Sequence, residues 1–127
     1  MTLELVDLSH VPGYAGPLHA HRHPDLANRF HFWCGASGHR YACTRFPANR
    51  VPSYEDVVSL YVRRRGGETI VLTVTTGEKI STPFGTDEVH VHIVQGGGEA
   101  AVREAFEDLS ALAIRRAPAY AIERRAA

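Results

Sequence analysis

The sequence lacks an excess of charge of either sign. Fourteen lysines and arginines balance fourteen aspartates and glutamates, so the formal net charge at pH 7 is zero. Proteins that bind nucleic acids without regard to sequence depend on many uncompensated cations. The balance therefore argues against a general binder of polyanions.

Long apolar runs are also missing. A helix needs about 20 consecutive apolar residues to cross a bilayer, and the apolar stretches of this chain are far shorter. The first residues, MTLELVDLSHVPG, contain no basic stretch followed by an apolar run, so they do not predict a signal peptide. We therefore expect a cytoplasmic protein that does not associate with a membrane.

Cysteine is scarce. Cys34 and Cys43 are the two cysteines of the chain, and such a pair provides neither a disulfide framework nor the spacing of a zinc finger. In a reducing cytosol we expect both to be buried thiols. A disulfide between adjacent strands is the alternative.

What the sequence does contain suffices for one domain. The chain has 127 residues, of which 44% are hydrophobic, and this is enough for one core. Residues 1–28 are rich in proline and show no sustained periodicity, which predicts an irregular N-terminal arm. A single domain is expected over 29–117, followed by a C-terminal tail over 118–127.

Alternation of apolar and polar side chains is the main signal for secondary structure. It marks strand-like runs at 30–34, 39–46, 58–63, 69–75 and 88–94. Residues 35–38 (GASG) and 66–67 (GG) have the composition of hairpin turns between the first two and the next two runs. In the second hairpin we expect Ile70, Leu72 and Val74 to face the same way.

A helical pattern follows three glycines. Four apolar residues recur at helical spacing within 99–116, namely Val102, Phe106, Leu109 and Ala113. Glu104, Glu107 and Asp108 lie mainly away from this stripe. The sequence thus predicts an α+β fold, an antiparallel sheet of four to five strands with one C-terminal helix packed on one face. If the strands share a common register, the other face carries Tyr61, Arg63, Thr73, Thr75, His90 and His92.

Histidine is abundant, with eight residues, and two groups have the spacing of metal ligands. His19, His21 and His23 alternate in one segment, and His90 and His92 alternate on a predicted strand. Alternate side chains of an extended backbone fall on one side, so these groups could converge on a divalent transition metal. Solvent-facing histidines without a ligand are the alternative.

Arginine and tyrosine are interleaved on the predicted strands. The residues concerned are Arg40, Tyr41, Arg45, Tyr61, Arg63 and Arg65. Guanidinium groups pair with phosphates and carboxylates, and aromatic rings stack on bases. Such a sheet surface suits a macromolecular partner, whereas a solvated hairpin end with core tyrosines is the alternative.

We therefore expect a non-catalytic binding protein that uses this Arg/Tyr surface, with a protein partner favoured over nucleic acid. A metal-binding or metal-dependent protein is the second hypothesis. Uncovered strand edges also allow a homodimer. No catalytic residue is predicted, because Ser37 lies between two strands and position 39 is His39 rather than the glycine of a nucleophile elbow.

Three segments carry a resemblance to known proteins. Residues 35–46 (GASGHRYACTRF), 60–65 (LYVRRR) and 88–94 (EVHVHIV) resemble a family of short uncharacterised bacterial proteins. The hairpin with its following strand and helix is also similar to GIY-YIG nucleases. The short connection before Glu88 departs from that family because it has no room for the catalytic helix. The similarity implies at most a scaffold kept for binding.

Overall fold

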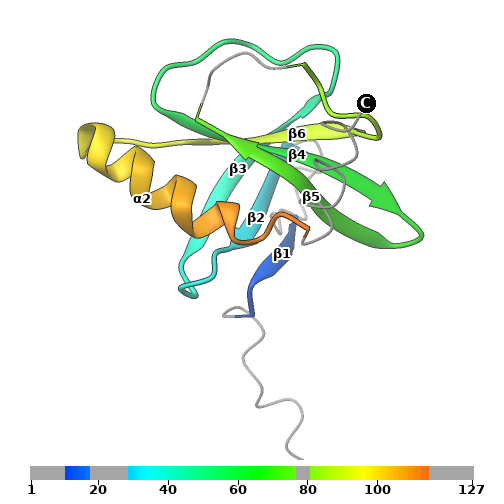
Figure 1. Ribbon diagram of the computed structural model, residues 1–127, viewed down its shortest axis with the longest axis horizontal. Helices are drawn as coiled ribbons and strands as arrows, with labels where there is room; N and C mark the ends of the chain where they lie inside the picture. Colours follow the sequence, from blue (N-terminus) through cyan, green and yellow to red (C-terminus); the bar gives the residue numbers. More distant parts are fainter. Residues whose placement is uncertain (1–10, 18–28, 77–80, 115–127) are drawn as a thin grey trace, which may run out of the picture.

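The computed structural model describes residues 11–17, 29–76 and 81–114. Within these ranges the chain forms six strands and one helix (Figure 1). They are β1 (Gly13–Pro17), β2 (Phe30–Cys34), β3 (Arg40–Pro47), β4 (Val57–Arg65), β5 (Glu68–Thr75), β6 (Glu88–Ile93) and α2 (Gly98–Ser110).

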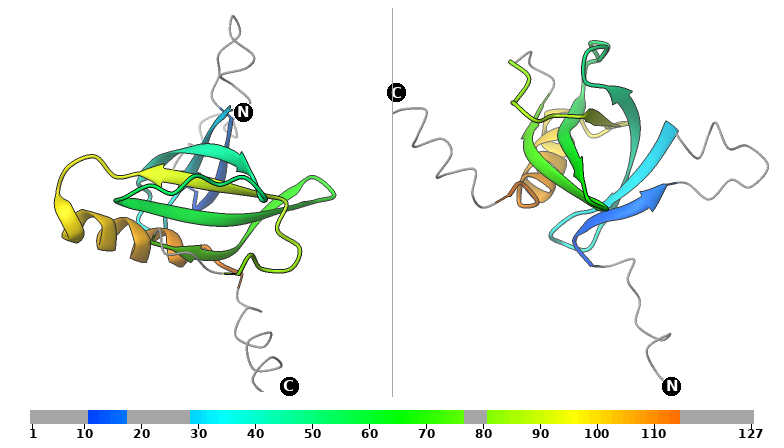
Figure 2. Two further views of the ribbon diagram at one scale, coloured as in Figure 1. Left: turned by 90° about the horizontal axis from the view of Figure 1, so that it is seen from above. Right: turned by 90° about the vertical axis from the view of Figure 1, so that its right-hand side faces the viewer.

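All six strands belong to one antiparallel sheet. The order is β1-β2-β3-β6-β4-β5, so the last strand in the sequence lies between the two predicted hairpins and pairs with both β3 and β4. The sheet is strongly curled, in the manner of a half-barrel (Figure 2), and its edge strands β1 and β5 approach each other. Long-range pairing by β6 therefore holds the two hairpins together.

The predicted α+β class is confirmed, but the sheet has six strands rather than four or five. The additional strand is β1, which lies in the segment predicted to be irregular. Its sequence, GYAGP, has no alternation of apolar and polar residues that predicts a strand. The segment is a strand because it pairs with β2. Residues 11 and 12 of the predicted arm precede β1, and residues 1–10 and 18–28 of the arm and the tail over 118–127 lie outside the described residues.

One face of the sheet carries the main core, and we call it the core face. Its buried residues include Trp33, Tyr41 and Leu60, and Ala105 and Leu109 of α2 belong to the same cluster. The opposite, outer face carries a smaller cluster of buried residues, Val57, Tyr61, Val89 and Val91. Both faces of β4 are therefore buried against apolar side chains, whereas β6 contributes Val89 and Val91 to the outer cluster and the buried, polar Glu88 and His90 to the core face.

The strict alternation predicted for β5 is wrong. Between the pairs Tyr61↔Thr73 and Val62↔Val71, β5 contains one extra residue. Such a bulge shifts the facing of the side chains that follow it. As a result Val71 and Val74 both lie in the main core.

The polar face predicted to unite Tyr61 with His90 and His92 does not form. Pairing of β4 with β6 places Leu60 opposite His90, and Tyr61 opposite Val89. His90 therefore lies on the core face, where it is buried, and Tyr61 lies on the outer face. Alternation within each strand follows from its own residues, but the register between strands does not.

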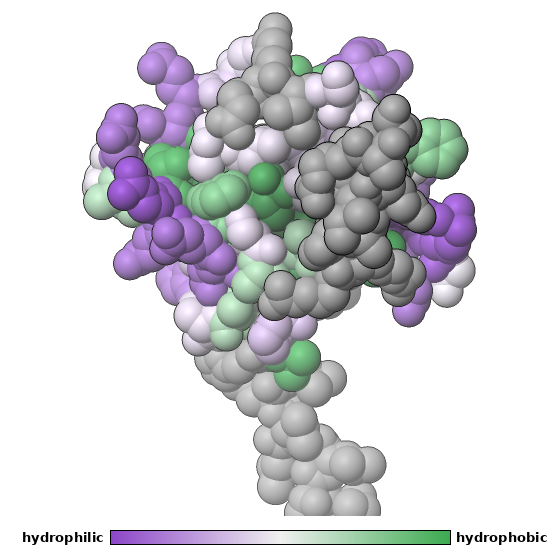
Figure 3. Space-filling view, viewed as in Figure 1, coloured by the Kyte–Doolittle hydropathy of each residue, from purple (hydrophilic) through white to green (hydrophobic). Residues whose placement is uncertain are grey.

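The helix begins after a run of glycines. Gly97 precedes it with a φ of 86°, a conformation that favours glycine, and a Cβ at this position would clash with Ala101. The helix ends at Ser110 rather than at the predicted Arg116. Its exposed side is hydrophilic (Figure 3). In the described ranges, no helix has the length and apolar character of a membrane span.

The two cysteines are buried and unpaired, as predicted. Cys34 pairs in register with Arg40, whereas Cys43 pairs with His31. Because side chains alternate along a strand, the two thiols point to opposite faces of the sheet. Burial raises the pKa of Cys43, so this thiol stays protonated.

Candidate functional site

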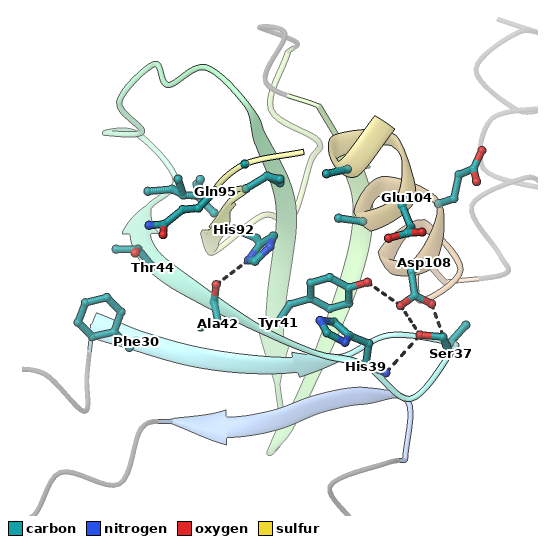
Figure 4. A pocket seen from close by; sticks show the side chains of 18 residues that line it. Phe30, Ser37, His39, Tyr41, Ala42, Thr44, His92, Gln95, Glu104 and Asp108 are labelled. Carbon is teal, nitrogen blue, oxygen red and sulfur yellow. Dashed lines mark hydrogen bonds between the residues drawn. The ribbon is translucent and has the colours of Figure 1, made fainter. Parts of the chain in front are cut away.

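A groove of about 1050 Å³ opens where β6 leaves the sheet (Figure 4). The pairing of β3 with β6 ends at Thr44↔Val91, so β6 supplies no partner for residues 40–43. One wall of the resulting gap is formed by α2. The polar groups that line the groove include Ser37, His39, Tyr41, His92, Glu104 and Asp108.

An open edge of β3 faces this groove. Nδ1 of His92 lies 2.9 Å from the carbonyl oxygen of Ala42, which shows that the backbone of Ala42 points toward β6 and away from β2. In an antiparallel strand, residues two positions apart point their backbone groups to the same side, so Arg40 does the same. In the described part of the chain, no strand pairs with this edge over 40–43.

His92 presents a hydrogen-bond acceptor in the groove. A carbonyl oxygen can only accept, so Nδ1 of His92 carries the proton and donates it to Ala42. The other ring nitrogen, Nε2, is then an acceptor in the neutral imidazole. The ring of Tyr41 packs edge-on against His92, with 5.0 Å between the ring centroids, and this contact helps to fix the imidazole in place.

Asp108 ties α2 to the β2–β3 hairpin. Its carboxylate accepts hydrogen bonds from the Ser37 backbone N–H at 2.7 Å, the Ser37 hydroxyl at 2.7 Å and the Tyr41 hydroxyl at 2.8 Å. Burial by itself would raise the pKa of Asp108, but these hydrogen bonds outweigh burial and lower it. Burial and the neighbouring Asp108 raise the pKa of Tyr41, so the phenol remains a donor.

Gly35 makes room for this carboxylate. A Cβ at Gly35 would lie well inside van der Waals distance of the Asp108 carboxylate. We predict that Gly35→Ala lowers the free energy of unfolding by about 2 kcal/mol, because the added methyl must displace Asp108 or the hairpin. Urea denaturation measures this loss. In an Asp108→Ala background the same change should cost less than half as much, and an equal cost in both backgrounds would contradict the contact.

Charge in the groove has one sign. Glu104, Glu107 and Asp108 line it, and its lining includes neither lysine nor arginine. Glu104 and Glu107 are exposed, and neither forms an ion pair with another described residue. The groove therefore combines negative charge with hydrogen-bond acceptors.

A second polar cluster is buried on the core face. Nε1 of Trp33 donates to Nδ1 of His90 at 2.8 Å, and Nε2 of His90 lies 2.8 Å from Oε1 of Glu88. An indole N–H only donates, so the proton of His90 is on Nε2 and is donated to Glu88. Burial lowers the pKa of His90 more than Glu88 raises it, which agrees with a neutral ring.

The Glu88 carboxylate also accepts hydrogen bonds from two arginines. Nε of Arg64 donates to Oε1 at 2.6 Å, and a terminal nitrogen of Arg45 donates to Oε2 at 3.2 Å. Burial alone would raise the pKa of Glu88, but the hydrogen bonds from His90 and the two arginines hold it at about 2. Glu88 is therefore an anion at neutral pH.

Tyr14 extends this network to the edge strand β1. Its hydroxyl and Nδ1 of His31 form a hydrogen bond of 2.7 Å. The guanidinium carbon of Arg64 lies 5.4 Å from the centroid of the Tyr14 ring, a cation–π contact. The network thus links β1, β2, β4 and β6 across the curled sheet, which explains how these strands keep their positions.

The histidines predicted to bind a metal fall into two groups. His19, His21 and His23 lie outside the described residues. Both ring nitrogens of His90 and one of His92 are engaged in hydrogen bonds. Over 11–17, 29–76 and 81–114, no three side chains of His, Cys, Asp or Glu are arranged to hold a metal ion.

The six residues predicted to share an Arg/Tyr surface are divided between the faces. Tyr41 and Arg45 face the core side, and Arg40 and Tyr61 face the outer side. Both tyrosines are buried. The division follows from alternation, because neighbouring residues of one strand point in opposite directions. The two remaining residues, Arg63 and Arg65, lie toward the end of β4.

The sequence did not predict Asp108 or Glu88, the central carboxylates of the two clusters, as site residues. Asp108 has the spacing of a solvated helix face, and its partner Ser37 is 71 positions away. Glu88 is separated by 43 positions from Arg45 and by 24 from Arg64. The partners come together only through the sheet, so no local pattern marks them.

Comparison of the chain with protein-family models, with curated proteins and with solved structures found no match.

Proposed function

We propose that this chain is a non-catalytic binding protein whose partner is a protein, held in the groove as an extended segment. The observation that carries the proposal is the edge of β3 over 40–43, with which no described strand pairs and of which Tyr41 and Ala42 line a groove of about 1050 Å³. An unpaired strand edge is a template for another chain, because its N–H and C=O groups can pair with an added strand.

The chemistry of nearby residues supports a binding role rather than a catalytic one. The raised pKa values of Tyr41 and Cys43 keep both groups protonated, so neither is an activated nucleophile or base. The Asp108 carboxylate already accepts three hydrogen bonds. Of these groups, Tyr41 and Asp108 line the groove, and their hydrogen bond helps to hold its shape.

The groove also favours protein over nucleic acid as the partner. Glu104 and Glu107 are exposed and line it, and they would repel a phosphate backbone. The unpaired, buried thiols Cys34 and Cys43 support a reducing compartment such as the cytosol for this interaction.

Photo-crosslinking in the cells that make the protein tests this proposal. A photoreactive amino acid replaces Gln95, which is exposed and lines the groove, or Glu68, which is exposed at the distant end of the β4–β5 hairpin. We expect Gln95 to crosslink to a discrete protein and Glu68 not to do so. Crosslinking to nucleic acid, or equally from both positions, would contradict a protein partner at this site.

A further inference from the structure

We infer that the partner segment carries arginine or lysine side chains that face α2, so that the groove recognises a basic extended peptide. This inference rests on the proposed function and names the chemistry of the partner. It is supported by the charge of the groove, by its hydrogen-bonding groups and by the position of the carboxylates in the same lining as the β3 edge.

The charge of the lining is uniformly negative. Glu104, Glu107 and Asp108 contribute three carboxylates, and the basic residues of the described chain all lie outside the lining. The nearest in sequence, Arg103, belongs to α2 but does not line the groove. A cationic side chain would therefore meet only carboxylates as charged groups, apart from any protonated histidine.

The hydrogen-bonding groups point to the same ligand chemistry. The acceptor Nε2 of His92 lies on the sheet side of the groove, and the carboxylates lie on the α2 side. Guanidinium and ammonium groups offer only donors. A basic side chain between the two walls would thus find acceptors on both sides, while a phosphate or carboxylate ligand would be repelled by the carboxylates of Glu104, Glu107 and Asp108.

The edge of β3 and the α2 carboxylates line the same groove. Tyr41 and Ala42 of β3 contribute to its lining, and α2 contributes Glu104, Glu107 and Asp108. Alternate side chains of an extended chain point the same way. Every second side chain of a strand added to β3 would therefore point toward the α2 side of the groove. Its other side chains would meet the apolar part of the lining, which includes Phe30, Ala42 and Ile93.

The direct test measures binding of fluorescent peptides to the full chain by anisotropy. The probe is a peptide of about nine residues, a common strand length, with alternating arginine and valine. Two further peptides have glutamate in place of arginine, or carry backbone N-methyl groups that remove strand pairing. We expect the basic peptide to bind, and the acidic and N-methylated peptides to bind at least about tenfold more weakly.

Matched variants locate the binding. Glu104→Gln and Glu107→Gln should each weaken the basic peptide about two- to fivefold at low salt, and less at high salt. Glu99→Gln makes the same charge change on the same helix outside the groove and should leave the affinity unchanged. Thermal unfolding confirms that the variants are folded.

Two results would overturn the inference and leave the proposed function standing. They are equal binding of the acidic and basic peptides, and an effect of Glu99→Gln as large as that of Glu104→Gln. Equal binding of the N-methylated peptide would contradict strand addition, and binding of spermidine as tight as that of the peptide would replace a peptide site with a site for small amines. Either of these two results would overturn the inference and the proposed function together. Loss of crosslinking at Gln95 together with no binding of any peptide would remove the proposed function itself.

Discussion

Glu88→Gln is expected to lower the free energy of unfolding by about 2 kcal/mol at pH 7. Glu88 is the shared anion of Arg45, Arg64 and His90. Its pKa falls from an ordinary value of 4.5 to about 2, which corresponds to about 3 kcal/mol. The side chains of Arg45 and Arg64 are 42% and 40% exposed, so solvent screening reduces this figure to about 2 kcal/mol.

The same change should alter the pH dependence of stability. Because the pKa of Glu88 is lowered by folding, its contribution is present above pH 4.5 and is lost as the pH falls toward 2. Urea denaturation of both proteins between pH 7 and 2 should therefore show a stability difference that shrinks below pH 4.5. A difference that stays constant over this range would contradict the role of the Glu88 charge.

Asp87→Asn is the matched control for this experiment. Asp87 is the neighbouring carboxylate, it is exposed, and it accepts a hydrogen bond from the backbone N–H of Arg64. Its hydrogen bond is to the backbone of Arg64 and not to the guanidinium that pairs with Glu88. We expect this substitution to change the free energy of unfolding by less than about 1 kcal/mol, because an exposed carboxylate gains little from its partners.

Leu109→Ala should destabilise the protein by about 3 kcal/mol. Leu109 is fully buried, with 0% of its surface exposed, and it joins α2 to the main core. Removing a buried isobutyl group loses its transfer free energy and leaves a cavity. Because Leu109 follows Asp108 in the chain, the substitution should also loosen the helical wall of the groove and weaken binding of the basic peptide.

Leu112→Ala provides the comparison for Leu109→Ala. Leu112 lies just beyond α2 and is only partly buried against the same core. The same chemical change there should cost less than half as much and leave peptide binding intact. Hydrogen exchange of the α2 amides, measured with chemical denaturation, separates a loosened helix from global unfolding. Equal losses at the two leucines would contradict the role of Leu109 as the anchor of α2.

The polar network around Glu88 and the groove beside α2 differ in whether their carboxylates are already paired. Glu88 and His90 are buried and satisfy each other, so they hold the curled sheet. Glu104 and Glu107 are exposed without ion pairs in the described chain. Their charge remains available to a partner, and this is why the two clusters carry different predictions.

Much of the local structure follows from the sequence alone. Both hairpins, β6 and the start of α2 are marked by alternation, by glycine turns and by helical spacing, because these signals depend on near neighbours. The strand β1 is the exception, since GYAGP forms a strand through its pairing with β2. The burial of Cys34 and Cys43 also follows from their apolar strands.

The tertiary structure alone decided the site. The sequence determined which residues alternate on each strand, but placing β6 between the hairpins set Leu60 opposite His90 and ended the β3–β6 pairing at Thr44↔Val91. That register buried His90 and left an open edge of β3 beside α2. A strand's own residues specify its two faces, whereas its neighbours and its register depend on contacts between distant segments.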